Sequence, residues 1–119
     1  MKIFTTKEIR EIDRYTIEHE GVSSIELIEQ VARGVVCEIV SRWRPNKRIA
    51  IFAGPGNNGA DALAVARMLI EEGYRPEIFL FNIGGNRLSA DCIIMRNRLL
   101  EMNYGDFTEV RGNFTFPDL

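Results

Sequence analysis

The sequence contains few of the residues that most often carry catalytic or metal-binding chemistry. It has one histidine, His19, and two cysteines, Cys37 and Cys92, which lie far apart and form no CxxC motif. A Ser-His-Asp triad or a zinc site cannot be assembled from this set. We expect both thiols to be reduced and mostly buried, as in cytoplasmic proteins. His19 lies between two glutamates and is interpreted as a solvated or helix-capping residue.

Long apolar runs and an excess of one charge are also absent. No segment approaches the roughly 20 apolar residues that cross a bilayer, and the N-terminus lacks the apolar core of a signal peptide. Membrane insertion and export are therefore not expected. Fifteen Lys and Arg residues against seventeen Asp and Glu give a net charge of −2, which provides no long-range field for nucleic acid. A short basic cluster, interpreted as a solvated helix end and strand entry, consists of Arg42, Arg44, Lys47 and Arg48.

The composition is that of one soluble globular domain. Of the 119 residues, 45% are hydrophobic and 27% are charged, a size and mixture typical of a single domain with one core. We therefore assign 1–119 to one domain and predict no structure for the tail 112–119.

The first part of the chain predicts two helices before any strand. Thr5-x-x-Glu8 is a capping box, and apolar residues keep approximate helical spacing from there to Gly21. A second capping box, Ser23-x-x-Glu26, opens a helix with a broad apolar stripe that ends at Pro45. The stripe and Trp43 are interpreted as core, with a dimer contact as the alternative.

From residue 48 onward, predicted strands and helices alternate. Apolar runs predict strands at 48–52 and 76–81, and a weak one at 107–110. A helix is predicted from about Ala60 to Gly73, and another, capped by Ser89, to about Met102. Alternation of this kind favours an α/β fold with a parallel sheet and right-handed crossovers. Two or three strands make a narrow parallel sheet, so we expect an incomplete α/β domain.

A turn rich in glycine and asparagine, AGPGNNGAD at 53–61, follows the first of these strands. Such a turn places backbone N–H groups at the carboxyl edge of the sheet, where α/β proteins commonly bind phosphate-bearing ligands. Gly54, Gly56 and Gly59 spell GxGxxG, but Asn82 stands where a dinucleotide fingerprint has an acid. No Lys-Ser/Thr pair follows Gly59, which excludes a Walker A loop.

Three polar residues of this turn, Asn57, Asn58 and Asp61, are chemically informative. An asparagine offers a carbonyl oxygen and two N–H donors, and Asp61 can accept backbone N–H bonds or reach a ligand hydroxyl. A hard cation prefers such oxygen ligands, although one amide falls well short of a full shell. The same residues suit a well-capped turn without a ligand, and spacing alone leaves both interpretations open.

Residues 53–67, AGPGNNGADALAVAR, resemble the signature of the YjeF N-terminal domain family, the NAD(P)H-hydrate epimerases. Residues 24–32, SIELIEQVA, are similar to that family's LMExAG helix, and residues 89–100 to its later DAxxN helix. The resemblance implies a Rossmann-like αβα domain, usually a homodimer. It further implies conversion of R-hydrated NADH or NADPH (NADHX, NADPHX) to the S form. An ATP- or ADP-dependent dehydratase then regenerates NADH or NADPH from the S form.

The resemblance also implies site residues. Asn57, Asn58, Gly59, Ala60 and Asp61 would contact the hydrated nucleotide, and Asn58 would supply one oxygen to a potassium ion. It identifies no catalytic acid or base. Together with the expected reduced thiols, it predicts a cytoplasmic enzyme with no nucleic-acid or membrane partner.

The sequence departs from the family pattern in two ways. Ala60 and Ala62 replace glycines, and their methyl groups would intrude on a ligand that approaches closely. The chain also stops about where the next strand of the site is expected, so we expect a fragment or a short relative with weak or absent turnover. A non-catalytic nucleotide-binding or scaffold module of the same fold is the alternative. A third possibility, an ordinary dinucleotide-binding half-domain, is disfavoured by the missing ribose acid.

Overall fold

The computed structural model describes residues 2–4, 23–83, 87–112 and 115, and the structural statements below concern these residues. The predicted helix between Thr5 and Gly21, His19 within it, and most of the tail 112–119 lie outside them. The elements are β1 (Lys2–Phe4), α2 (Ser24–Arg42), β2 (Ile49–Ala53), α3 (Asn57–Glu71), β3 (Glu77–Phe81), α4 (Ala90–Glu101) and β4 (Phe107–Val110).

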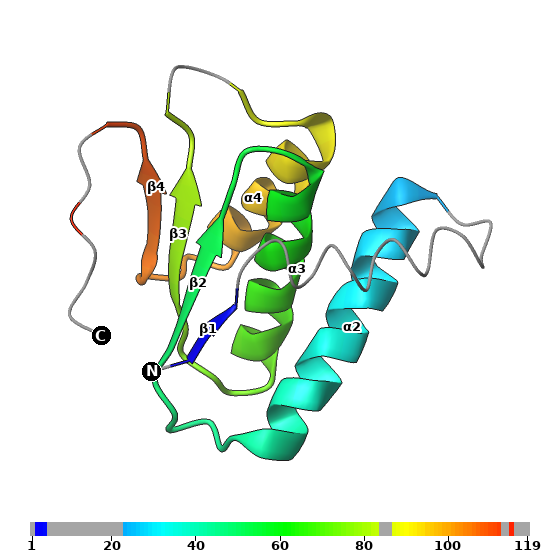
Figure 1. Ribbon diagram of the computed structural model, residues 1–119, viewed down its shortest axis with the longest axis vertical. Coiled ribbons are helices and arrows are strands. Elements are labelled where there is room, and N and C mark those ends of the chain that lie inside the picture. The colour runs from blue at the N-terminus through cyan, green and yellow to red at the C-terminus, as the bar shows by residue number, and fades with distance from the viewer. Residues whose placement is uncertain (1, 5–22, 84–86, 113–114, 116–119) are drawn as a thin grey trace.

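The four strands form one parallel sheet in the order β1-β2-β3-β4. In this register Ala50 lies opposite Glu77, and Ile78 lies opposite Phe107. Each strand pairs with the next one along the chain, so right-handed crossovers bring α2, α3 and α4 to the same face of the sheet (Figure 1). The predicted α/β class with a parallel sheet is confirmed. Among the described strands, the order in the sheet follows the order along the chain without a reversal.

One part of the predicted order is wrong, because a strand precedes the helices. β1 pairs in parallel with β2, with Lys2 opposite Ile49 and Phe4 opposite Ile51. A segment of three residues contains no alternation from which a strand could be inferred. Its conformation depends on pairing with a strand that lies more than 40 positions away in the sequence.

The core lies between the helix layer and the sheet. Ser23 caps α2 as predicted, since its Oγ accepts a hydrogen bond from the backbone N–H of Glu26 at 3.3 Å. The apolar stripe of α2 is buried, and Trp43 packs at its end, where its carbonyl accepts a hydrogen bond from the Tyr74 hydroxyl. The interpretation of the stripe as core is confirmed, and Trp43 is half-buried against that core. The buried residues of α2 are Leu27, Ile28, Val31, Ala32, Val35, Val36 and Ile39.

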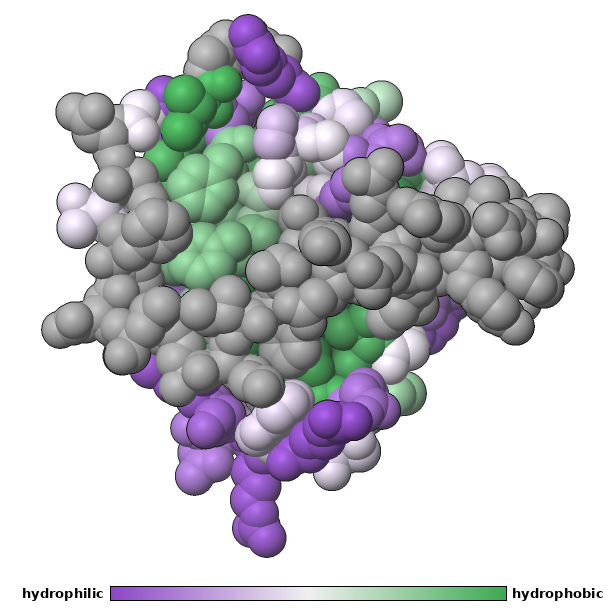
Figure 2. Space-filling view, viewed as in Figure 1, coloured by the Kyte–Doolittle hydropathy of each residue, from purple (hydrophilic) through white to green (hydrophobic). Residues whose placement is uncertain are grey.

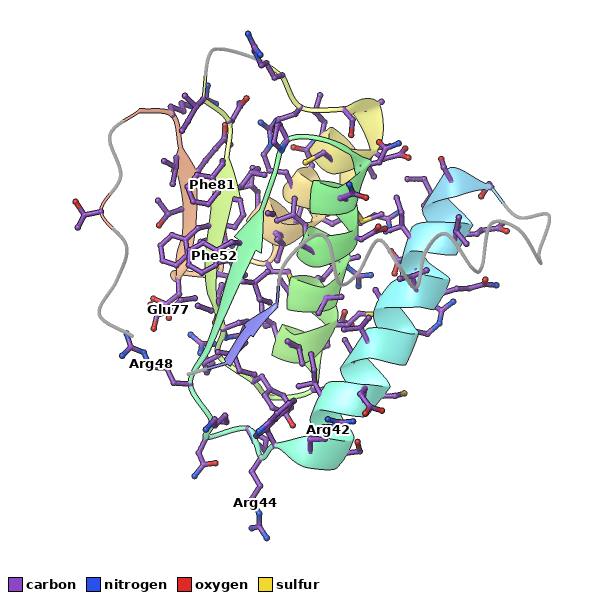
Figure 3. All side chains as sticks on the ribbon, viewed as in Figure 1. Arg42, Arg44, Arg48, Phe52, Glu77 and Phe81 are labelled. Atoms are coloured by element: carbon purple, nitrogen blue, oxygen red, sulfur yellow. The ribbon has the colours of Figure 1, made fainter. Side chains whose placement is uncertain are left out.

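The sheet face away from the helices carries an aromatic cluster. Phe52 stacks on Phe79 with ring centroids 5.3 Å apart and on Phe81 at 6.1 Å. Alternation along the strands turns these rings away from Ile51 and Leu80, which belong to the core. Figure 3 labels Phe52 and Phe81 on this side, and Figure 2 shows apolar side chains gathered on the same face. Both faces of the sheet are therefore apolar, as parallel sheets require.

Candidate functional site

Residues 54–58, called the asparagine loop below, comprise the connection between β2 and α3 and the first two residues of α3, at the carboxyl edge of the sheet. The helix begins at Asn57 rather than near Ala60 as expected, with Gly56 as its N-cap. The carbonyl of Gly56 accepts hydrogen bonds from the N–H groups of Gly59 at 3.0 Å and Ala60 at 3.3 Å. Gly56 has no side chain to cap the helix, so the N–H groups of Asn57 and Asn58 are left to ligand or solvent. A helix start of this kind favours an anionic group.

The five residues predicted to contact a ligand are the first five residues of α3, but their exposure to solvent differs. Asn57 is exposed and Asn58 is half-buried, whereas Gly59, Ala60 and Asp61 are buried. The carboxylate of Asp61 belongs to a residue with 0% exposure. The side chains that a ligand can reach in this arrangement are therefore those of the two asparagines.

The two alanines that replace family glycines lie in the interior of the protein. Ala60 and Ala62 are fully buried and belong to the hydrophobic core. The expectation that these methyl groups would intrude on a closely approaching ligand stays a prediction, and in this structure both methyl groups pack in the core. Because α3 is covered by α2, α4 and the sheet together, residues on most sides of its first turns point into packed protein.

Gly59 is required by the packing of α3 against the strand that precedes it. A Cβ placed on Gly59 would lie 1.7 Å from the carbonyl oxygen of Gly54. A Cβ on Gly54 or Gly56 would have nothing within 4 Å. The third glycine of the GxGxxG pattern therefore permits close helix–strand contact, the role this position has in nucleotide-binding folds.

The start of α4 holds the asparagine loop from the other side, a contact that the sequence did not predict. The backbone N–H of Ser89 donates to the carbonyl of Pro55 at 2.9 Å. The buried thiol of Cys92 lies 3.9 Å from the carbonyl oxygen of Gly54, as a weak donor. The one signal in the sequence was Ser89 as a helix cap, which the structure confirms: its Oγ accepts from the N–H of Cys92 at 3.1 Å.

Burial raises the pKa of the Cys92 thiol from 9.0 to about 11, with a smaller opposing effect of Arg96 and a still smaller raising effect of Glu109. The native state therefore holds this proton more tightly than the unfolded chain. The stability contributed by the protonated Cys92 thiol is complete below pH 9 and is lost as the pH rises to about 11.

We expect the free energy of unfolding to fall as the pH rises through this range, by at most about 1.4 kcal/mol per pH unit from this group. Urea unfolding at about pH 8 and about pH 10 should show a steeper decline in the wild type than in Cys92→Ala. Tyr104, whose pKa burial raises to about 12, contributes to the decline in both proteins. Equal declines would contradict the prediction.

Asn82, which stands where a dinucleotide fingerprint has its ribose acid, is turned into the protein. It is 1% exposed, its Nδ2 donates to Oε2 of Glu109 at 3.1 Å, and its Oδ1 accepts from the N–H of Arg87 at 3.2 Å. The Glu109 carboxylate also pairs with Arg96 at 3.5 Å and Arg111 at 2.5 Å. Asn82 therefore fastens the chain after β3 to β4, which further disfavours an ordinary dinucleotide-binding half-domain.

Two cations of the basic cluster have acidic partners in the same molecule. Arg42 pairs with Glu38 on α2, and Nε of Arg48 lies 2.7 Å from Oε1 of Glu77 on β3. Figure 3 shows Arg42 and Arg44 near the end of α2, and Arg48 beside Glu77. The cluster is exposed, in agreement with its interpretation as a solvated helix end and strand entry.

Metal and membrane signatures are absent from the described part of the chain. Within it, no three or more His, Cys, Asp or Glu residues are grouped where they could hold a metal ion. No described helix combines the length and apolar character needed to span a membrane. Cys37 and Cys92 are both free thiols, but Cys37 is exposed, so the expectation of mostly buried thiols holds only for Cys92.

Comparison with known proteins identifies relatives over most of the chain. The family model described as YjeF-related protein N-terminus matches residues 24–110. An NAD(P)H-hydrate epimerase of Leuconostoc citreum is 32% identical over 114 residues, covering 96% of this chain and 50% of that protein. One of Limosilactobacillus reuteri is 39% identical over 84 residues, covering 70% of this chain and 39% of that protein.

A solved structure shares the fold. The crystal structure of yeast ynu0, YNL200c, matches with a TM-score of 0.57 and 25% sequence identity, over 92% of this chain and 47% of that one. The chain spans about half the length of several curated relatives that it matches. With the family model covering residues 24–110 and the asparagine loop standing between β2 and α3, the chain belongs to the YjeF-related protein N-terminus family.

Proposed function

We propose that this chain is the N-terminal half of an NAD(P)H-hydrate epimerase domain, an isomerase that interconverts the R and S forms of NADHX and NADPHX. The observation that carries the proposal is the asparagine loop, which presents two accessible amides at the start of α3. The names of the relatives from Leuconostoc and Limosilactobacillus support it. The substrate is then a small nucleotide rather than a macromolecule.

The loop can bind such a nucleotide in two ways. The amide groups at the start of α3 suit a phosphate oxygen, because they point beyond the helix and carry its positive dipole end. The side chains of Asn57 and Asn58 each offer donors and an acceptor, which suits the ribose hydroxyls and the hydrated nicotinamide ring. Asp61 lies beneath the surface, and we assign no proton donor or acceptor among the described residues.

A potassium ion belongs to the resemblance, with Asn58 as one ligand. The described residues alone do not fit such an ion. Hard cations take six or more oxygen ligands, whereas the loop offers only the amide oxygens of Asn57 and Asn58 and the carbonyls of Gly54, Pro55 and Gly56, each of which also accepts a hydrogen bond. The positive end of α3 also disfavours a cation at this point. No step of the proposed function therefore depends on the ion.

Longer relatives support a functional link to a dehydratase. The bifunctional NAD(P)H-hydrate repair enzymes Nnr of Salinibacter ruber and Coxiella burnetii are 36% and 31% identical, and the match covers 15% and 16% of those proteins. We propose that the S form passes to an ATP- or ADP-dependent dehydratase. We also propose a homodimer, which the resemblance implies. A cytoplasmic location is proposed too, and the two free thiols support it.

Nucleotide binding tests the proposal directly. Titration with R-NADPHX should raise the melting temperature progressively with the nucleotide concentration. At a hundredfold excess over Kd, the stabilisation is about 2.7 kcal/mol. Asn58→Ala should lose most of this shift. Asn46→Ala, which changes an exposed asparagine in the loop between α2 and β2, should keep it. No shift in the wild type would favour the non-catalytic scaffold and overturn the epimerase proposal.

Turnover is a separate question. Incubating the chain with R-NADPHX, a dehydratase specific for the S form, and ATP couples epimerisation to the return of NADPH absorbance. We expect weak or no acceleration over the spontaneous rate, because the chain spans about half the length of the epimerases it matches. Rapid recovery of NADPH would contradict this expectation while supporting the proposed substrate.

A further inference from the structure

We propose that Ser89, the residue that caps α4, is a positioning residue for the asparagine loop. No atom of Ser89 needs to touch the ligand for this role. Its consequence for nucleotide binding rests on the proposed function, whereas its effect on the conformation of the loop does not.

The first turn of α4 holds two successive carbonyl groups of the loop. The N–H of Ser89 donates to Pro55 at 2.9 Å, and the thiol of Cys92 faces the carbonyl oxygen of Gly54 at 3.9 Å. Figure 1 shows the loop between β2 and α3 beside the start of α4. The 2.9 Å bond is the stronger of the two, and it joins positions 34 residues apart in the sequence.

α3 holds the same backbone from the opposite side. The carbonyl oxygen of Gly54 lies so close to Gly59 that no Cβ fits between them. The carbonyl of Gly56 is engaged by the amides of Gly59 and Ala60. All three carbonyls that precede Asn57 thus have partners, and α4 supplies the partners of the first two. The orientation of Asn57 and Asn58 depends on both helices.

Ser89 takes part in the cap of α4 and in the contact with the loop through two different groups. Its Oγ accepts from the N–H of Cys92 at 3.1 Å, while the N–H of the same residue donates to Pro55. The preceding chain is fastened by Asn82, whose Oδ1 accepts from the N–H of Arg87. Removing the hydroxyl should loosen the first turn of α4. Because one residue makes both bonds, the bond to Pro55 should weaken with it.

Two serine caps in this chain permit a matched comparison. Ser23 caps α2 through a hydrogen bond to Glu26 at 3.3 Å, as Ser89 caps α4, but no described contact joins Ser23 to the asparagine loop. Amide hydrogen exchange of Gly59 and Ala60 reports on the loop, since both amides donate to Gly56. We expect Ser89→Ala to accelerate this exchange about fivefold more than Ser23→Ala, the factor that corresponds to one typical cap.

Conservative replacement provides the second arm of the test. Ser89→Asp keeps an equally good cap and should restore slow exchange of Gly59 and Ala60. Equal acceleration in Ser89→Ala and Ser23→Ala, or none in Ser89→Ala, would overturn the proposal. If Ser89→Ala does not fold, Ser89→Gly, a milder loss of the cap, should give a smaller acceleration of exchange in the same amides. No acceleration in Ser89→Gly would also overturn the proposal.

Nucleotide titration separates this proposal from the proposed function. If R-NADPHX binds the wild type, Ser89→Ala should raise its Kd several-fold, and Ser89→Asp should return it toward the wild-type value. If R-NADPHX binds none of these proteins, the epimerase proposal fails. The exchange rates of Gly59 and Ala60 then still decide whether Ser89 positions the loop.

Discussion

Replacing Gly59 with alanine is expected to destabilise the protein by about 3 kcal/mol or more. The new Cβ would lie 1.7 Å from the carbonyl oxygen of Gly54 and 2.7 Å from its carbonyl carbon, well inside van der Waals contact. Both atoms belong to the backbone, directly after a strand in the interior of the sheet, so neither can rotate away. α3 and β2 would have to separate, and the contact of Gly54 with α4 would be disturbed as well. Urea unfolding followed by circular dichroism measures the loss.

The same substitution at Gly34 provides a control with the opposite sign. Gly34 is exposed in the middle of α2, and a Cβ placed there would have nothing within 4 Å. Alanine in an exposed helix interior is favoured over glycine, so Gly34→Ala is expected to stabilise the protein by about 0.5–1 kcal/mol. A Gly59→Ala variant that unfolds at the wild-type urea concentration would show that the loop can relax around the methyl group.

Those parts of the fold that depend on local signals were predictable from the sequence. Ser23 and Ser89 were identified as helix caps, and both accept the expected hydrogen bond from an amide three residues on. The apolar runs at 48–52 and 76–81 correspond to β2 and β3 within one residue at each end. The information for a cap or a buried strand lies within a few neighbouring residues, so spacing and composition reveal it.

The remaining parts depend on contacts between distant segments. The start of α3 was placed too late because glycine and asparagine are poor helix formers. Here Gly56 serves as N-cap, and Gly59 is tolerated because only glycine fits against Gly54. β1 was missed because its three residues become a strand only beside β2. Neither outcome has a signal in the local sequence.

The candidate site was predictable in position but not in orientation. The glycine and asparagine pattern located the turn at the carboxyl edge of the sheet, where the structure places it. Which side chains face outward depends on the packing around α3, and that packing exposes Asn57 while burying Asp61. The hydrogen bond from the N–H of Ser89, the cap of α4, to the carbonyl of Pro55 in the loop could not be predicted from residue spacing within either segment.

A cluster of charges on the outer side of the helix layer gives the second large expected effect. One oxygen of Glu29, on α2, lies 2.6 Å from a guanidinium nitrogen of Arg67 on α3, and its other oxygen pairs with Arg98 on α4. Arg67 also pairs with Glu71 at 2.6 Å, and its Nε is buried without a hydrogen-bond partner among the described residues. Glu29 therefore joins α2 to both other helices through one carboxylate.

Glu29→Gln is expected to destabilise the protein by about 2 kcal/mol. The substitution keeps the size of the side chain but leaves Arg67, only 20% exposed, with one carboxylate in place of two. The loss is smaller than for a fully buried pair because 15% of the Glu29 side chain remains exposed. Urea unfolding gives the free energy.

Glu38→Gln is the matched control, since it makes the same change on the same helix in a pair with Arg42 whose side chains are both 61% exposed. Solvent and salt screen such a pair, so its loss should cost less than about 0.5 kcal/mol. The difference between the two variants measures what burial and the second ion pair of Glu29 add together, because the charge change and the helix are held constant. Losses in the free energy of unfolding that agree within a few tenths of a kcal/mol would mean that water solvates Arg67 and Arg98 as well as it solvates Arg42 once the carboxylate is removed. The helix layer would then be held together by its apolar contacts alone.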